Sequence, residues 1–155
     1  MSPYATAAVV GVAGGAGATR LSVELAATLA RDGRDVVVLD AAFATQGLSR
    51  YAPGRIDPDV TAVLTDDAML DDALVDLDAA APGRLAVVPA YAPFTGLAAA
   101  KTPEAARRLG ATLDRAADRF DHVLVDAPPV ASNPAVAAVD AADRVALVAP
   151  GTDRG

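Results

Sequence analysis

The stretch that decides the fold of this 155-residue chain is Val10-Gly11-Val12-Ala13-Gly14-Gly15-Ala16-Gly17-Ala18-Thr19-Arg20. An apolar run over residues 7–12 enters it, and a helical pattern with Leu21, Leu25 and Leu29 on one stripe leaves it. Strand, glycine-rich turn and helix in this order are typical of a phosphate-binding loop. Glycines let successive backbone N–H groups curl round an anion, and the helix N-terminus adds positive dipole.

The match to the motif Gly-x-x-x-x-Gly-Lys-Ser/Thr is incomplete. Gly11 or Gly14 can open the loop, Gly17 closes it, and Thr19 stands where a magnesium-binding hydroxyl belongs. Ala18 occupies the position of the phosphate-binding lysine. The functional question therefore turns on that alanine.

Composition excludes several classes of function. The formal net charge is −7 and Lys101 is the only lysine, so we expect no direct nucleic-acid patch. The absence of cysteine excludes disulfides and thiolate metal sites. No apolar run reaches membrane-spanning length and no secretory signal is visible, so we expect a cytoplasmic protein without a membrane segment.

Strand and helix patterns alternate along the chain. Apolar runs predict strands over residues 7–12, 35–40, 85–89, 122–126 and 144–149. Helices are predicted over 19–31, 59–64, 70–77 and 94–100, from Thr102-Pro103 onward, and after Asn133-Pro134, with Asp57-Pro58 and Asn133 as caps. This alternation predicts a single three-layer α/β domain over residues 1–155, with a mainly parallel sheet covered on both faces.

Two of the predicted strands end in an aspartate, Asp40 and Asp126. The carboxyl ends of parallel strands meet at the sheet edge where α/β proteins bind ligands. We expect both carboxylates near Thr19, as candidates to hold magnesium. The alternative is that they cap neighbouring backbone N–H groups.

Three segments in this order resemble the ParA/MinD branch of the P-loop ATPases. Residues 13–19, Ala-Gly-Gly-Ala-Gly-Ala-Thr, stand where that branch has a deviant Walker A loop, Lys-Gly-Gly-x-Gly-Lys-Thr/Ser. Residues 33–40 and 121–129 resemble its second strand and its Walker B strand. The resemblance implies binding of ATP or ADP with Mg²⁺. It assigns nucleotide binding to Gly14, Gly15, Ala16, Gly17, Ala18, Thr19 and Arg20, and magnesium to Thr19, Asp40 and Asp126.

The departures from the family pattern affect catalysis. Ala13 stands at the signature lysine that reaches a partner subunit's nucleotide, Ala18 at the phosphate-binding lysine, and Ala42 at an aspartate that positions water. The resemblance also implies a chain shortened at its C-terminus, since family members continue with further helix and strand.

We therefore hypothesise a degenerate, nucleotide-binding regulatory protein with little or no ATPase activity. It would act through a protein partner or a homodimer, in cell organisation or partitioning by analogy. One alternative is an active ATPase whose missing cation comes from Arg20 or from a partner's arginine; another is a ligand-free interaction scaffold. Tyr51, Tyr91 and Phe94 are expected to pack ordinarily, with a partner surface as their alternative role.

Overall fold

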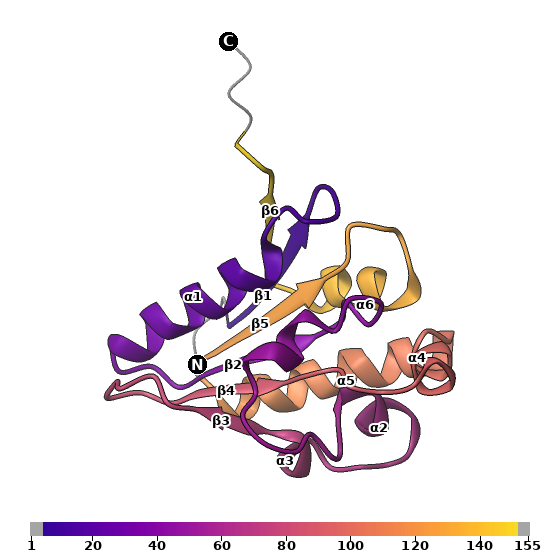
Figure 1. Ribbon diagram of the computed structural model, residues 1–155, viewed down its shortest axis with the longest axis horizontal. Helices are drawn as coiled ribbons and strands as arrows, with labels where there is room; N and C mark the ends of the chain where they lie inside the picture. Colours follow the sequence, from indigo (N-terminus) through magenta and orange to yellow (C-terminus); the bar gives the residue numbers. More distant parts are fainter. Residues whose placement is uncertain (1–4, 152–155) are drawn as a thin grey trace.

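The computed structural model describes residues 5–151 and contains a six-stranded sheet (Figure 1). The spatial order is β3-β4-β2-β5-β1-β6, and every neighbouring pair is parallel except β3 with β4. The bounds are β1 Thr6–Gly11, β2 Val36–Asp40, β3 Val75–Leu77, β4 Leu85–Val88, β5 His122–Ala127 and β6 Arg144–Val148. The predicted mainly parallel α/β fold is confirmed.

Helices cover both faces of this sheet (Figure 1). They are α1 Ala18–Arg31, the 3₁₀ helix η1 Gly47–Tyr51, α2 Val60–Thr65, α3 Leu70–Ala73, α4 Phe94–Ala100, α5 Pro103–Arg119 and α6 Asn133–Ala141. Val36 and Val38 pack with α1, whereas Val37 and Leu39 pack with α5. Because alternate residues of a strand face opposite sides, β2 is buried throughout and reads as one apolar run.

The helix predicted over residues 70–77 is wrong in its second half. Helix α3 ends at Ala73, and Val75–Leu77 forms β3, antiparallel to β4. Leu74 already has extended backbone angles. Pairing with β4 therefore decides the structure of a short apolar segment whose local pattern fits either a helix or a strand.

Two predicted helix caps lie at other residues. Asp59 rather than Asp57 caps α2, accepting the Ala62 N–H at 3.1 Å. Ser132 rather than Asn133 caps α6, while the Asn133 amide donates to the Lys101 carbonyl at 2.8 Å. The predicted Thr102 cap of α5 is confirmed by its bond from the Ala105 N–H.

The apolar stripe of α1 does not face the core as a unit. Leu21 and Leu25 are exposed, and the fully buried positions are Ser22, Ala26 and Ala30. Small side chains let this helix lie close against the sheet. The first turn of α1 is thereby held at the end of β1, beside the glycine loop. Within residues 5–151, no helix is long and apolar enough to cross a membrane.

Candidate functional site

A cavity of about 640 Å³ lies at the carboxyl ends of β1 and β5. Three segments that are distant in sequence enclose it: the glycine loop, the β2–η1 connection with η1, and the segment after β5. Its lining comprises Gly11, residues 13–20, Ala42, Ala44, Thr45, Gly47, Arg50, Tyr51 and residues 126–130. All seven residues predicted to bind nucleotide, 14–20, therefore line one cavity.

The backbone of the glycine loop depends on two of its glycines. Gly15 and Gly17 have φ angles of 77° and 90°, in the left-handed region that favours glycine. Gly17 is the N-cap of α1, and no side chain caps the helix there. The first N–H groups of α1 thus lack side-chain acceptors, which is the arrangement that suits an anion.

Thr19 and Asp126 meet in the cavity. The Thr19 hydroxyl donates a hydrogen bond of 2.5 Å to the Asp126 carboxylate, joining α1 to β5. Burial raises the pKa of Asp126, and the hydrogen bond from Thr19 partly opposes that rise. The sequence prediction that these two residues lie together is confirmed by this contact.

Asp40 lies beside Asp126 in the parallel register of β2 and β5, but it does not line the cavity. Its side chain is fully buried, and its two oxygens accept N–H bonds from Ala42 at 2.9 Å and Ala90 at 3.4 Å. Burial, and then the charge of Asp126, raise the pKa of Asp40 to about 8. The capping alternative is therefore present in the structure, and magnesium binding by Asp40 stays a prediction.

The donor set of the cavity fits magnesium. Thr19 and Asp126 offer a hydroxyl and a carboxylate, both hard oxygen donors. Mg²⁺ usually takes only one or two protein ligands and completes its shell with water and phosphate oxygens. Among residues 5–151 there is no cluster of three or more histidine or carboxylate side chains that could form a dedicated all-protein cage.

The three alanines at the positions where the resemblance expects charged residues also line the cavity. These are Ala13, Ala18 and Ala42. Ala18 is the first residue of α1, and Ala42 donates its N–H to Asp40. The cavity lining therefore has alanine side chains at the positions where the resemblance expects two ammonium groups and a carboxylate.

Arg50 and Tyr51, which both lie in η1, are among the lining residues that sequence reasoning did not assign to the site. The sequence predicts neither a helix nor a strand over this segment, because a short 3₁₀ helix leaves no periodic signal in sequence. Tyr51, Tyr91 and Phe94 are 39%, 64% and 83% exposed, so ordinary core packing is wrong for these aromatics. Instead, Tyr51 lines the cavity, whereas Tyr91 and Phe94 are exposed outside it.

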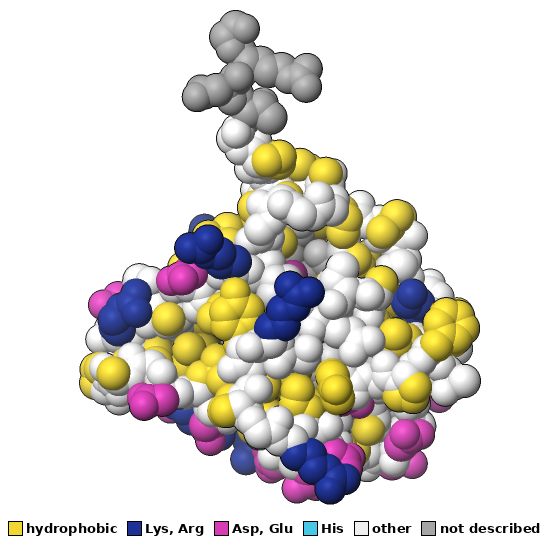
Figure 2. All heavy atoms as spheres, viewed as in Figure 1, with side chains coloured by type: hydrophobic (Ala, Val, Ile, Leu, Met, Phe, Trp, Pro, Cys, Tyr) yellow, Lys and Arg dark blue, Asp and Glu magenta, His cyan; other side chains and the backbone are white. Residues whose placement is uncertain are grey.

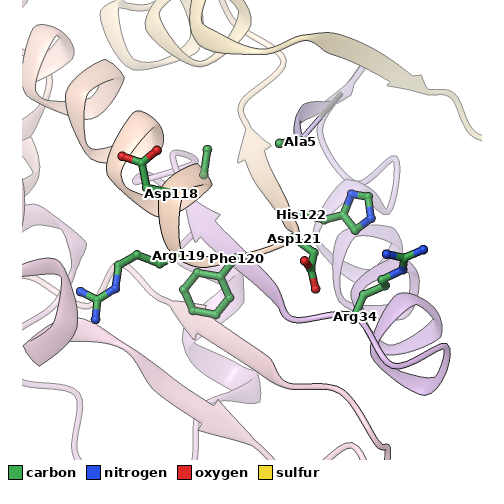
Figure 3. Close-up of a pocket in the computed structure, with 8 residues that line it drawn as sticks. Ala5, Arg34, Asp118, Arg119, Phe120, Asp121 and His122 are labelled. Atoms are coloured by element: carbon green, nitrogen blue, oxygen red, sulfur yellow. The ribbon is translucent and has the colours of Figure 1, made fainter. Parts of the chain in front are cut away.

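A second cavity of about 520 Å³ includes the start of β5 (Figure 3). Arg34, Asp118, Arg119, Asp121 and His122 contribute polar side chains to it. The Asp121 carboxylate accepts the Asp35 N–H at 2.8 Å, and Arg119 pairs with Asp71. These two contacts hold neighbouring elements together, and the glycine loop lies at the opposite ends of the strands.

Comparison with known proteins agrees with this geometry. Residues 5–151 match the AAA domain family. The sporulation initiation inhibitor protein Soj of Bacillus subtilis (strain 168) is 30% identical over 145 residues, which cover 90% of this chain and 56% of Soj.

Solved structures share the fold. The septum site-determining protein MinD of Pyrococcus horikoshii OT3, complexed with Mg-ADP, superposes with a TM-score of 0.79 and 23% identity over 94% of this chain and 57% of MinD. Cobyrinic acid a,c-diamide synthase of Mycobacterium smegmatis, with an ATP analogue and magnesium, gives 0.78 and 23% over 94% and 58%. The chain spans slightly more than half the length of these relatives. By its family match and its fold, the chain belongs to the ParA/MinD type of P-loop ATPases.

Proposed function

We propose that this protein is a nucleotide-binding regulator of the ParA/MinD type with little or no ATPase activity. One observation carries the proposal. The cavity is lined by the backbone of the glycine loop and by the Thr19–Asp126 pair, and its lining also includes three alanines, Ala13, Ala18 and Ala42. This combination supports binding without hydrolysis, because donors for phosphate and magnesium lie beside alanines at positions where the resemblance expects charged catalytic groups.

Binding in this proposal depends on the loop backbone. The N–H groups of residues 14–19 bind the phosphates, aided by the dipole of α1. Thr19 and Asp126 would hold Mg²⁺, which neutralises phosphate charge when bound. Because no lysine lines the cavity, we expect nucleotide affinity to depend strongly on magnesium.

Catalysis in phosphoryl transfer rests on charge stabilisation and on positioning of the nucleophile. With alanine at position 18, the lysine that stabilises the charge is absent. With alanine at position 42, the aspartate that positions the attacking water is absent. We therefore expect ATP hydrolysis close to the uncatalysed background. The protein would act by association with a protein partner or a second copy, in cell organisation or partitioning, by analogy with the relatives named above.

A second candidate function is favoured by the arginines in the cavity. Arg20 and Arg50 both line it, and an arginine can stabilise charge in phosphoryl transfer. On this alternative the protein is an active ATPase with a substituted cation. The remaining alternative is a scaffold that binds no nucleotide.

Calorimetric titration of the purified protein with ATP and ADP, with and without Mg²⁺, separates these functions when combined with a phosphate-release assay. We expect weak, magnesium-dependent binding and turnover at background. Robust turnover that disappears in Thr19→Ala would favour the active enzyme. Absence of binding at millimolar nucleotide, in both the wild type and Ala18→Lys, would favour the scaffold.

A further inference from the structure

Arg50 lines the cavity from η1, a short helix that lies next to Thr19 at the end of the glycine loop. A Cβ atom at Gly47, the first residue of η1, would lie 3.3 Å from both Oγ1 and Cγ2 of Thr19. A 3₁₀ helix has three residues per turn, so residues 47 and 50 lie on the same face. Arg50 is therefore on the side of η1 that faces Thr19.

The element that carries Arg50 is anchored on both sides. Leu48 is fully buried in the core beneath α1. The Gln46 amide donates to the Ala92 carbonyl at 3.2 Å and accepts the Ala92 N–H at 3.3 Å. Ser49 closes the turn by donating to the Gln46 carbonyl at 2.6 Å. A fixed backbone limits the conformational freedom that the Arg50 side chain loses on binding.

The charge of the cavity is unusual for this chain. The full sequence carries a formal charge of −7, yet the ionisable side chains in the cavity lining are Arg20, Arg50, Tyr51 and Asp126. In Figure 2, acidic side chains lie mainly along the left, lower and lower-right margins of the visible face, and its central part is largely hydrophobic or uncharged with basic side chains among them. Such a local excess of positive charge attracts an anion.

Arg50 also has no competing partner in the described part of the chain. Its near neighbour Arg55 is paired with Asp57, and Arg84, Arg108 and Arg119 are paired with other aspartates. Within residues 5–151 the Arg50 guanidinium makes no ion pair or hydrogen bond. It can therefore bind a ligand without first breaking an internal contact.

Position on the helix distinguishes Arg50 from Arg20. Successive residues of an α-helix are rotated by about 100°, so Arg20, although it lines the cavity, leaves α1 in a different direction from Thr19. Arg50, by contrast, shares its face of η1 with Gly47, where an added Cβ atom would lie 3.3 Å from the Thr19 side chain.

We propose that Arg50 binds the phosphate chain of a nucleoside di- or triphosphate and supplies in cis the positive charge that the loop lost with its lysine at position 18. Its planar guanidinium can donate two parallel hydrogen bonds to a phosphate group. This inference rests on the proposed nucleotide binding, and it assigns the cation to this chain rather than to a partner.

The test compares Mg-ATP and Mg-tripolyphosphate binding to the full chain by calorimetry. The variants are Arg50→Ala, Arg50→Lys and the control Arg107→Ala. The Arg107→Ala change removes the same charge from an exposed position on α5, where the Arg107 guanidinium lies 3.7 Å from the Glu104 carboxylate. Thermal unfolding without ligand checks that each variant is folded.

We expect Arg50→Ala to lower the affinity for both ligands by about ten- to hundredfold, because one charge-assisted contact is lost. Arg50→Lys should lie between Arg50→Ala and the wild type, and Arg107→Ala should bind like the wild type. In an Ala18→Lys background the loss at position 50 should shrink, because the lysine then supplies the same charge.

Equal binding by wild type and Arg50→Ala would overturn the role of Arg50 and leave nucleotide binding intact. A loss for Mg-ATP without a loss for Mg-tripolyphosphate would also overturn it, because the contact would then be to the nucleoside. If the wild type binds neither ligand while Ala18→Lys binds both, the proposed function itself fails.

Discussion

The Thr19 hydroxyl donates to the Asp126 carboxylate across 107 residues of sequence, at 2.5 Å. This bond joins the first turn of α1 to β5 inside the cavity. It brings together the hydroxyl and the carboxylate expected at a magnesium site, while Asp40 remains behind them in the core. The pairing makes the cavity, rather than the loop alone, the site that we propose for the nucleotide.

The first prediction concerns the pH dependence of stability through Asp40. Burial and the charge of Asp126 raise the pKa of this carboxyl from 3.8 to about 8 in the folded protein. Between these values the folded chain keeps a proton that the unfolded chain has released. The stabilisation is therefore full below about pH 4 and is lost as the pH rises through about 8.

Asp40→Asn removes this titration. We expect the free energy of unfolding of the wild type, measured in urea, to fall relative to that of Asp40→Asn as the pH is raised across this window. Asp114→Asn, a change at an exposed position of α5, is the control. Parallel pH curves for the wild type and Asp40→Asn would show that Asp40 does not hold the proton.

The second prediction concerns the missing lysine. Ala18→Lys should tighten Mg-ATP binding about ten- to hundredfold, because one charge-assisted hydrogen bond contributes about 1.5–3 kcal/mol. The lysine would begin at the first residue of α1 and line the cavity. Calorimetry measures the change, and an affinity equal to the wild type would mean that the loop does not hold the phosphates.

The third prediction concerns association. In the family, the signature lysine reaches the nucleotide of the partner subunit, and here that position is Ala13. We expect any dimer of this protein to form independently of ATP. Light scattering across a concentration series, with and without Mg-ATP, measures the mass. Conversion of monomer to dimer only with Mg-ATP would contradict the expectation.

The fourth prediction concerns the turn before β4. A Cβ atom at Gly83 would lie 2.2 Å from the Arg34 carbonyl oxygen and 2.7 Å from that of Ala30. Both are backbone atoms that cannot rotate away, so Gly83→Ala should destabilise by about 1–3 kcal/mol or more.

Gly110→Ala is the matched control within α5. A Cβ atom there meets nothing within 4 Å, so alanine should stabilise the helix by about 0.5–1 kcal/mol. Urea unfolding of both variants gives the comparison. A Gly83→Ala protein as stable as the wild type would show that the turn can move away from α1.

Local sequence determined much of the architecture. The order of strands and helices followed from apolar periodicity, because β2 and β5 are almost wholly buried and α5 has a capping threonine followed by proline. The glycine loop and Asp126, the last but one residue of β5, located the cavity, since parallel strands bring their carboxyl ends to one edge. Thr19 was assigned to the cavity by its position in the loop motif, two residues after Gly17.

Tertiary structure decided what periodicity does not encode. Residues 75–77 became a strand because β4 offered an open edge, and the buried stripe of α1 was set by its close approach to the sheet. Asp40 was directed into the core by the N–H groups of Ala42 and Ala90, one of them 50 residues away. Arg50 reached the cavity because Gly47 packs on Thr19, a contact between segments whose local sequences carry no sign of each other.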